Sequence, residues 1–120
     1  MNMYDFNDYQ FEMLYKVSND TELSLQEKAL YYKLYKHYSE EYDYYSNGVI
    51  EDLDWASLSN EIGGDRLLQC FIKLMNRGYI GMRLAGLQLL VHQDVVDMCK
   101  EEAEEKSKNK KKLRYAEDFF

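Results

Sequence analysis

Residues 63–91 read GGDRLLQCFIKLMNRGYIGMRLAGLQLLV, and the order of elements that they predict decides the fold. The glycine pair at the start ends one helix and opens a tight turn into the next. Apolar side chains recur along one arc of this next helix, which ends at Gly78, and they are Leu67, Leu68, Phe71, Leu74 and Met75. Two alternating apolar runs follow, 79–84 and 87–91, and they predict a β-hairpin with its turn at Ala85-Gly86.

Two helices and a short strand precede the hairpin and its helix. Ser24-Leu25-Gln26-Glu27 has the form of a capping box, in which the serine bonds the amide three residues on and the glutamate reaches back. Residues 49–53 are a short strand candidate. Asp54 and Asp65 suit the N-caps of the second and third helices. We expect these two helices to cross over an apolar cluster of Trp55, Leu58, Phe71 and Leu74.

The order helix, strand, short helix, tight turn, helix, hairpin is that of a winged helix-turn-helix, a mainly α fold with a small β-hairpin wing. We assign this domain to residues 23–93. Residues 1–22 form an N-terminal arm, and their alternating apolar side chains favour an extended segment, although several also fit one helical face. Residues 94–120 form a C-terminal helix and a charged tail.

Composition limits the class of protein. With 120 residues and 46% apolar content, the chain has room for one domain with a core. No stretch is long and apolar enough to cross a membrane, and the acidic N-terminus is no signal peptide, which favours a cytoplasmic protein without a membrane partner. Cys70 and Cys99 lack the spacing of a zinc site, so we expect small buried hydrophobes and no metal.

Catalytic motifs are missing from the sequence. His37 and His92 belong to no nucleophile motif, and the chain has no glycine-rich phosphate loop. The acidic residues between 51 and 54 alternate without a metal-binding pattern. We therefore expect a protein that is not an enzyme and that needs no cofactor.

The net charge of −7 is unevenly distributed. Residues 1–60 hold 12 acidic and 4 basic side chains, and residues 94–120 hold 8 acidic and 7 basic ones. Residues 61–93 hold 2 acidic and 4 basic side chains, which makes this segment net positive. A regional reversal of charge within an acidic chain favours contact with nucleic acid at that segment.

The third helix lies in this net-positive segment and carries polar side chains opposite its apolar arc. They are Arg66, Gln69, Lys73, Asn76 and Arg77. A helix of this kind can enter the major groove, where cations bond guanine edges or phosphate and amides suit adenine. Arg83, near the hairpin tip, is a candidate phosphate or minor-groove contact. An ordinary solvated helix face is the alternative interpretation.

Three stretches also resemble a known family. Residues 23–31 (LSLQEKALY), 55–63 (WASLSNEIG) and 74–80 (LMNRGYI) look like the N-terminal winged-helix domain of plasmid and phage replication initiators and DnaD-like replication proteins. The resemblance covers roughly residues 9–93. It implies the winged-helix fold and DNA binding through the third helix, which maps here onto Arg66, Gln69 and Lys73.

A protein-binding role competes with DNA binding. An acidic surface rich in tyrosine repels phosphate and suits a protein interface, and its candidate contacts are Tyr35, Tyr42, Tyr44 and Tyr45. An apolar patch at Val95 and Val96 favours a homodimer. We expect a duplex DNA-binding protein of phage or mobile-element type, in replication initiation or transcription regulation. The alternative is a winged helix that inhibits or recruits a host or replication protein, including by mimicking DNA.

Overall fold

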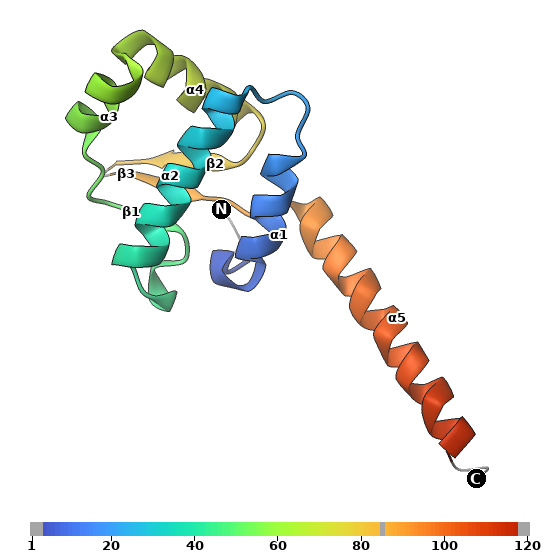
Figure 1. Cartoon of the computed structure of the whole chain (residues 1–120). Coiled ribbons are helices and arrows are strands. Elements are labelled where there is room, and N and C mark those ends of the chain that lie inside the picture. The colour runs from blue at the N-terminus through green and yellow to red at the C-terminus, as the bar shows by residue number, and fades with distance from the viewer. Residues whose placement is uncertain (1–3, 85, 118–120) are drawn as a thin grey trace.

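The computed structural model describes residues 4–84 and 86–117, and side chains as far as residue 105. This part of the chain is mainly helical and holds one small antiparallel sheet, as expected from the sequence (Figure 1). The elements are α1 (Phe6–Ser18), α2 (Leu25–Glu41), the 3-10 helix η1 (Tyr44–Ser46), β1 (Val49–Ile50), α3 (Trp55–Ile62), α4 (Gly64–Asn76), β2 (Ile80–Arg83), β3 (Gly86–Leu89) and α5 (Gln93–Glu117).

The three strands pair in the order β1-β3-β2, so β3 lies in the middle of the sheet. β2 and β3 form the predicted hairpin, with Arg83 opposite Gly86. β1, which precedes α3 in the chain, pairs with the other side of β3 and places Ile50 opposite Leu87. Gly86, expected in the hairpin turn, is instead the first residue of β3, and Ala85 lies outside the described residues.

Side-chain caps begin α2 and α3 where the sequence predicts them. The Ser24 hydroxyl accepts from the Glu27 amide at 3.1 Å, and the Glu27 carboxylate accepts from the Ser24 amide at 2.8 Å. The Asp54 carboxylate accepts from the Ser57 amide at 3.0 Å. Each cap satisfies helix N–H groups that have no partner within the helix. Both starts are therefore fixed by residues close together in the sequence.

Backbone geometry at two glycines delimits α4. Gly63, at φ +95°, is the N-cap, so the prediction that Asp65 caps this helix is wrong. The helix begins at Gly64, so Asp65 already lies in its first turn. At the other end Gly78 has φ +79°, and the next amide, that of Tyr79, bonds the Leu74 carbonyl at 3.0 Å. Gly78 thus ends α4 as predicted.

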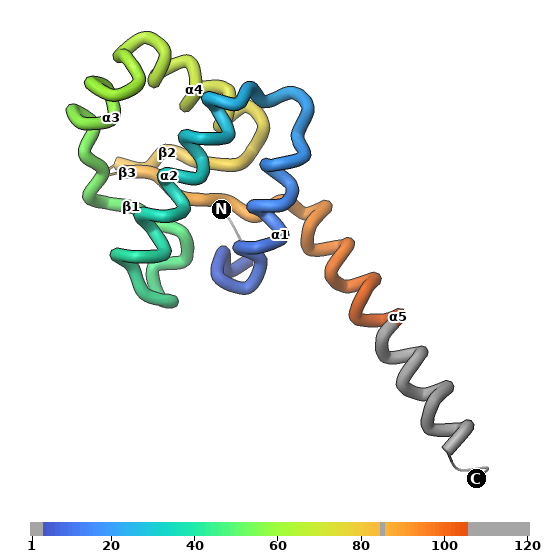
Figure 2. Tube along the Cα trace, in the orientation of Figure 1, coloured from blue at the N-terminus to red at the C-terminus, as the bar shows by residue number. Residues whose placement is uncertain are grey.

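Residues 6–18 form the helix α1, so the extended arm expected from the alternating pattern is wrong. The Asp5 carboxylate caps α1 by accepting from the Asn7 amide at 2.9 Å. Phe6, Met13 and Val17 are fully buried, because α1 lies against α2 and the beginning of α5 (Figure 2). The apolar pattern fitted both structures, and burial of this one face selects the helix.

The core lies between the helices and the sheet. Its largest fully buried side chains include Tyr31, Tyr38, Tyr79, Leu74, Ile80, Leu87 and Leu89. The predicted cluster between α3 and α4 is confirmed in part. The rings of Trp55 and Phe71 lie 5.0 Å apart and Leu58 packs against the buried core, but the Trp55 side chain is 40% exposed. This packing fixes α4 against α3 and leaves the opposite side of α4 facing outward.

Candidate functional site

The outward side of α4 carries most of the polar residues predicted to contact DNA. Arg66, Gln69 and Asn76 are exposed, and Lys73 is half-buried. With 3.6 residues per turn, these four fall on one part of the helix circumference. α2 and α3 cover the opposite side, where Phe71 is buried. The structure therefore brings four of the six predicted residues together on one helix face.

The cations of α4 have no partner, a state that among residues 4–84 and 86–105 they share only with Lys100 of α5. Residues 4–84 and 86–93 hold eight lysines and arginines, and six of them bond a neighbouring group. The bonded pairs are Lys16 with Asp94, Lys28 with the Ser18 carbonyl, Lys33 with Glu61, Lys36 with Glu40, Arg77 with Asp20, and Arg83 with Gln88. Within this range Arg66 and Lys73 make no hydrogen bond or ion pair, and they lie about 10 Å apart along the α4 axis.

Apolar side chains share the outward side of α4. Leu68, which belongs to the predicted apolar arc, is 60% exposed, and Ile72 is 43% exposed. They are four residues apart and therefore neighbours on the helix surface. Trp55 of α3 is also exposed in part while its ring contacts Phe71. The predicted arc was too broad, because a helical pattern does not show how much of it the neighbouring helices cover.

Arg77, predicted to contact DNA, binds an internal partner. Its Nε and Nη2 atoms both lie 2.9 Å from Oδ2 of Asp20, and the Tyr79 hydroxyl donates to the same oxygen. Burial acts to raise the pKa of Asp20, but the hydrogen bonds from Tyr79 and Arg77 prevail and lower it to about 2. Asp20 therefore stays ionised, and Arg77 holds the end of α4 against the α1–α2 loop.

The hairpin presents one cation. Arg83 is exposed at the end of β2, and its Nη1 donates to the Gln88 side-chain oxygen at 2.8 Å. Gln88 in turn donates to the Asn47 carbonyl at 3.0 Å. Because the partner of Arg83 is a neutral amide, its positive charge is not compensated, and the hydrogen bond holds the guanidinium on the sheet surface.

The four tyrosines predicted at a protein interface divide into two pairs. Tyr35 and Tyr42 are half-buried and pack against the core. Burial and the hydrogen bond to the Asp52 carboxylate raise the pKa of Tyr42. Tyr44 and Tyr45 lie on η1, where Tyr45 is 90% exposed. Of these four tyrosines, the two on η1 are therefore the exposed ones.

The prediction of an exposed apolar patch at the start of α5 is wrong. Val95 is almost fully buried and Val96 is fully buried inside this single chain. α1 lies against α5 and covers both side chains, whereas an extended segment was expected in place of α1. Because both side chains are internal, they are not available for contact with a second copy, and the homodimer loses its predicted contact surface.

The described part of the chain offers little to a metal or a membrane. Within residues 4–84 and 86–105, no group of three or more His, Cys, Asp or Glu side chains is placed to hold a metal ion. Among the described helices, none is long and apolar enough to cross a bilayer. Cys70 is buried and Cys99 half-buried, both with free thiols, and burial raises the pKa of each.

Comparison with protein-family models, curated proteins and solved structures finds no match to this chain. Two features mark the surface of α4: the unpaired cations Arg66 and Lys73, and the exposed apolar pair Leu68 and Ile72.

Proposed function

We propose that this chain is a non-enzymatic winged helix-turn-helix protein that binds duplex DNA through α4. The order α2, β1, α3, α4, β2, β3 supports this fold, with α3 and α4 as the helix-turn-helix and the hairpin as the wing. The sequence resemblance to replication initiators supports a role in replication initiation or transcription regulation of a phage or mobile element.

The unpaired state of Arg66 and Lys73 is the observation that carries the proposal. In an acidic protein, cations without an acidic partner are the ones free to bind phosphate. Gln69 and Asn76 lie on the same side of α4 and suit adenine edges, while Leu68 can contact thymine methyl groups. One helix face therefore offers groups for both phosphate and base contacts.

The expected affinity is low. Arg66, Lys73 and Arg83 supply three phosphate contacts, which predicts a slope of log affinity against log salt of about −3 for one copy of the chain. The net charge of −7 opposes the approach of DNA. Binding is therefore expected at low ionic strength and should weaken steeply as salt is added.

A charge-reversal pair tests the role of α4. The variant carrying Arg66→Glu and Lys73→Glu should lose binding to a generic fluorescent duplex in low salt and keep the melting temperature of the parent, because neither side chain is in the core. The control carries Lys36→Glu and Lys100→Glu, which change the net charge equally on exposed positions of α2 and α5. The control should retain most of the binding.

A protein-binding winged helix is the second candidate, supported by the exposed aromatic pair Tyr44 and Tyr45. Both follow Asp43, and the first 60 residues are strongly acidic, which suits a partner with a basic surface. If the parent binds no duplex in low salt, or if the α4 reversal binds as well as the control, DNA recognition by α4 is wrong. The acidic tyrosine surface then becomes the leading candidate.

A further inference from the structure

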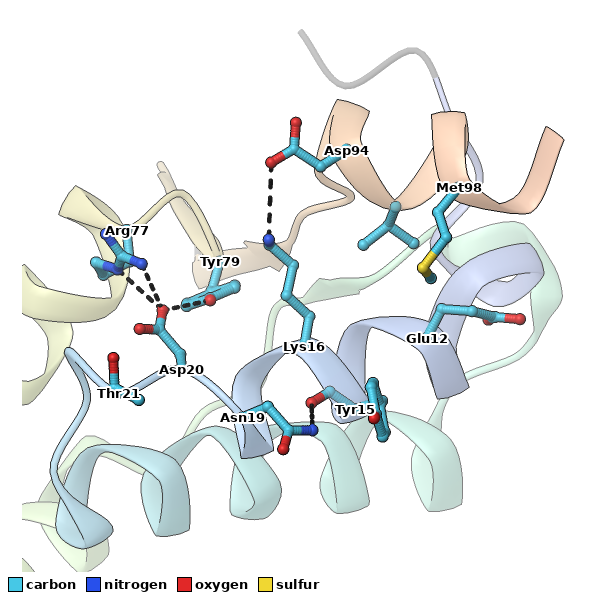
Figure 3. A pocket seen from close by; sticks show the side chains of 11 residues that line it. Glu12, Tyr15, Lys16, Asn19, Asp20, Thr21, Arg77, Tyr79, Asp94 and Met98 are labelled. Atoms are coloured by element: carbon cyan, nitrogen blue, oxygen red, sulfur yellow. Dashed lines mark hydrogen bonds and ion pairs between the residues drawn. The ribbon is translucent and has the colours of Figure 1, made fainter. Parts of the chain in front are cut away.

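A cavity of about 420 Å³ lies where α1, α5, the α1–α2 loop and the end of α4 meet (Figure 3). Its volume falls in the range of small-molecule sites, which is roughly 300–1,000 Å³. Polar side chains from the loop and from the end of α4 line one part of the cavity, and Tyr15 and Met98 line another. The cavity lies away from the outward side of α4, so this inference does not depend on DNA binding.

The polar part of the cavity has unused hydrogen-bond donors. Arg77 binds Asp20 through Nε and Nη2, and its Nη1 makes no hydrogen bond to a described residue. Asp20 is fully engaged, because its second oxygen accepts from the Glu22 amide at 2.9 Å. The Thr21 hydroxyl, also on the cavity wall, has no partner among the residues described. Arg77 therefore offers a donor that cannot accept, and the Thr21 hydroxyl, which can donate or accept, is available beside it.

Lys16 adds a second cation to this wall. Figure 3 shows its side chain reaching from α1 toward Asp94, with Nζ 3.7 Å from the carboxylate. That distance is longer than a charge-assisted hydrogen bond, and the Asp94 side chain is 82% exposed. Such an exposed ion pair contributes little to stability, and its two side chains separate easily. Lys16 can therefore turn to an anion in the cavity.

The remaining wall is apolar. The Tyr15 ring is 69% exposed, and Met98 and Val95 of α5 face the same cavity. Glu12 also lines this part, and together with Asp94 it disfavours ligands with several negative charges. The walls thus combine two cations, each beside a carboxylate, at one part with an aromatic ring and a thioether at another.

We propose that this cavity binds a small monoanion with an apolar body, with its carboxylate between Lys16, Arg77 and Thr21 and its body against Tyr15 and Met98. The carboxylate accepts hydrogen bonds from the guanidinium Nη1, the ammonium and the hydroxyl. The apolar body covers the exposed ring of Tyr15, which removes apolar surface from water. Recognition needs both parts of the ligand.

Three ligands with one apolar body and different head groups test the site: 3-phenylpropionate, 3-phenylpropanol and 3-phenylpropylamine. Each is titrated into the full chain, and binding is followed by the backbone amide NMR signals of Tyr15, Lys16 and Thr21. The carboxylate should bind at least tenfold more tightly than the alcohol, and the amine should be the weakest. Lys16→Met should lower the carboxylate affinity about tenfold and leave the alcohol unchanged.

Lys100→Met is the matched control, because it removes one positive charge from an exposed position of α5 that does not line the cavity. It should bind the carboxylate like the parent. The proposal is overturned if the amine binds as tightly as the carboxylate, if Lys16→Met has no more effect than Lys100→Met, or if none of the three ligands gives a saturable shift. A folded spectrum of each variant shows that the loss is local.

Discussion

A Cβ atom on Gly86 would lie 1.9 Å from the carbonyl oxygen of Ile50, far inside van der Waals contact. The two residues come from β3 and β1, which pair antiparallel across the sheet. Glycine at this position lets the first half of the domain, which holds β1, approach the hairpin closely. The contact joins segments that are 36 residues apart in the sequence.

Replacing Gly86 by alanine should therefore separate β1 from β3. We expect Gly86→Ala to lower the free energy of unfolding by about 3 kcal/mol, the upper end for overpacking a well-packed site. Gly81→Ala is the control, because a Cβ there would meet the Leu90 side chain at 3.4 Å, an ordinary contact. Urea unfolding measures both variants, and equal stability would mean that the sheet tolerates a shift of β1.

Phe71→Ala tests the junction of α3 and α4. The Phe71 ring is buried and contacts Trp55, so its removal should cost about 3–5 kcal/mol. Leu68→Ala removes an apolar side chain from the same helix but at an exposed position, and should change stability by about 0.5 kcal/mol. Thermal melts compare the two. Similar losses would show that α4 is rotated about its axis relative to the structure described.

Asp20→Asn tests the internal ion pair. The substitution leaves Arg77 without a charged partner and weakens the bond from Tyr79. Because Arg77 is partly exposed, water compensates in part, and we expect a loss of about 2 kcal/mol. Asp97→Asn, at an exposed position of α5, should be nearly neutral. Chemical denaturation that gives the same midpoint for both variants would contradict a stabilising role for the pair.

The same carboxylate predicts a pH dependence. The pKa of Asp20 is about 2 in the folded chain, below its ordinary value of 3.8. The stabilisation is therefore complete above about pH 4 and is lost as the pH falls through 2, a loss of about 2 kcal/mol. Between pH 5 and pH 2, the free energy of unfolding should fall more steeply for the parent than for Asp20→Asn. If the free energies of the two proteins fall equally with pH, the partners of Asp20 do not lower its pKa.

The sequence by itself determined where several helices begin and end. The caps at Ser24 and Asp54 and the stop at Gly78 depend on bonds between residues at most five positions apart. Because such bonds join residues close together in the sequence, the residue pattern is enough to predict them. The hairpin and the contact of Trp55 with Phe71 followed from the same local patterns and from the order of the elements.

Only the tertiary structure decided which faces are covered. The N-terminal segment suited a strand or a helix until burial of Phe6 and Val17 selected α1. Once α1 lies against α5, Val96 is internal, and α2 and α3 leave Leu68 open. Arg77 bonds Asp20, which lies 57 residues away in the sequence. Burial and ion pairing depend on neighbours brought together by folding, and periodicity along one segment does not identify those neighbours.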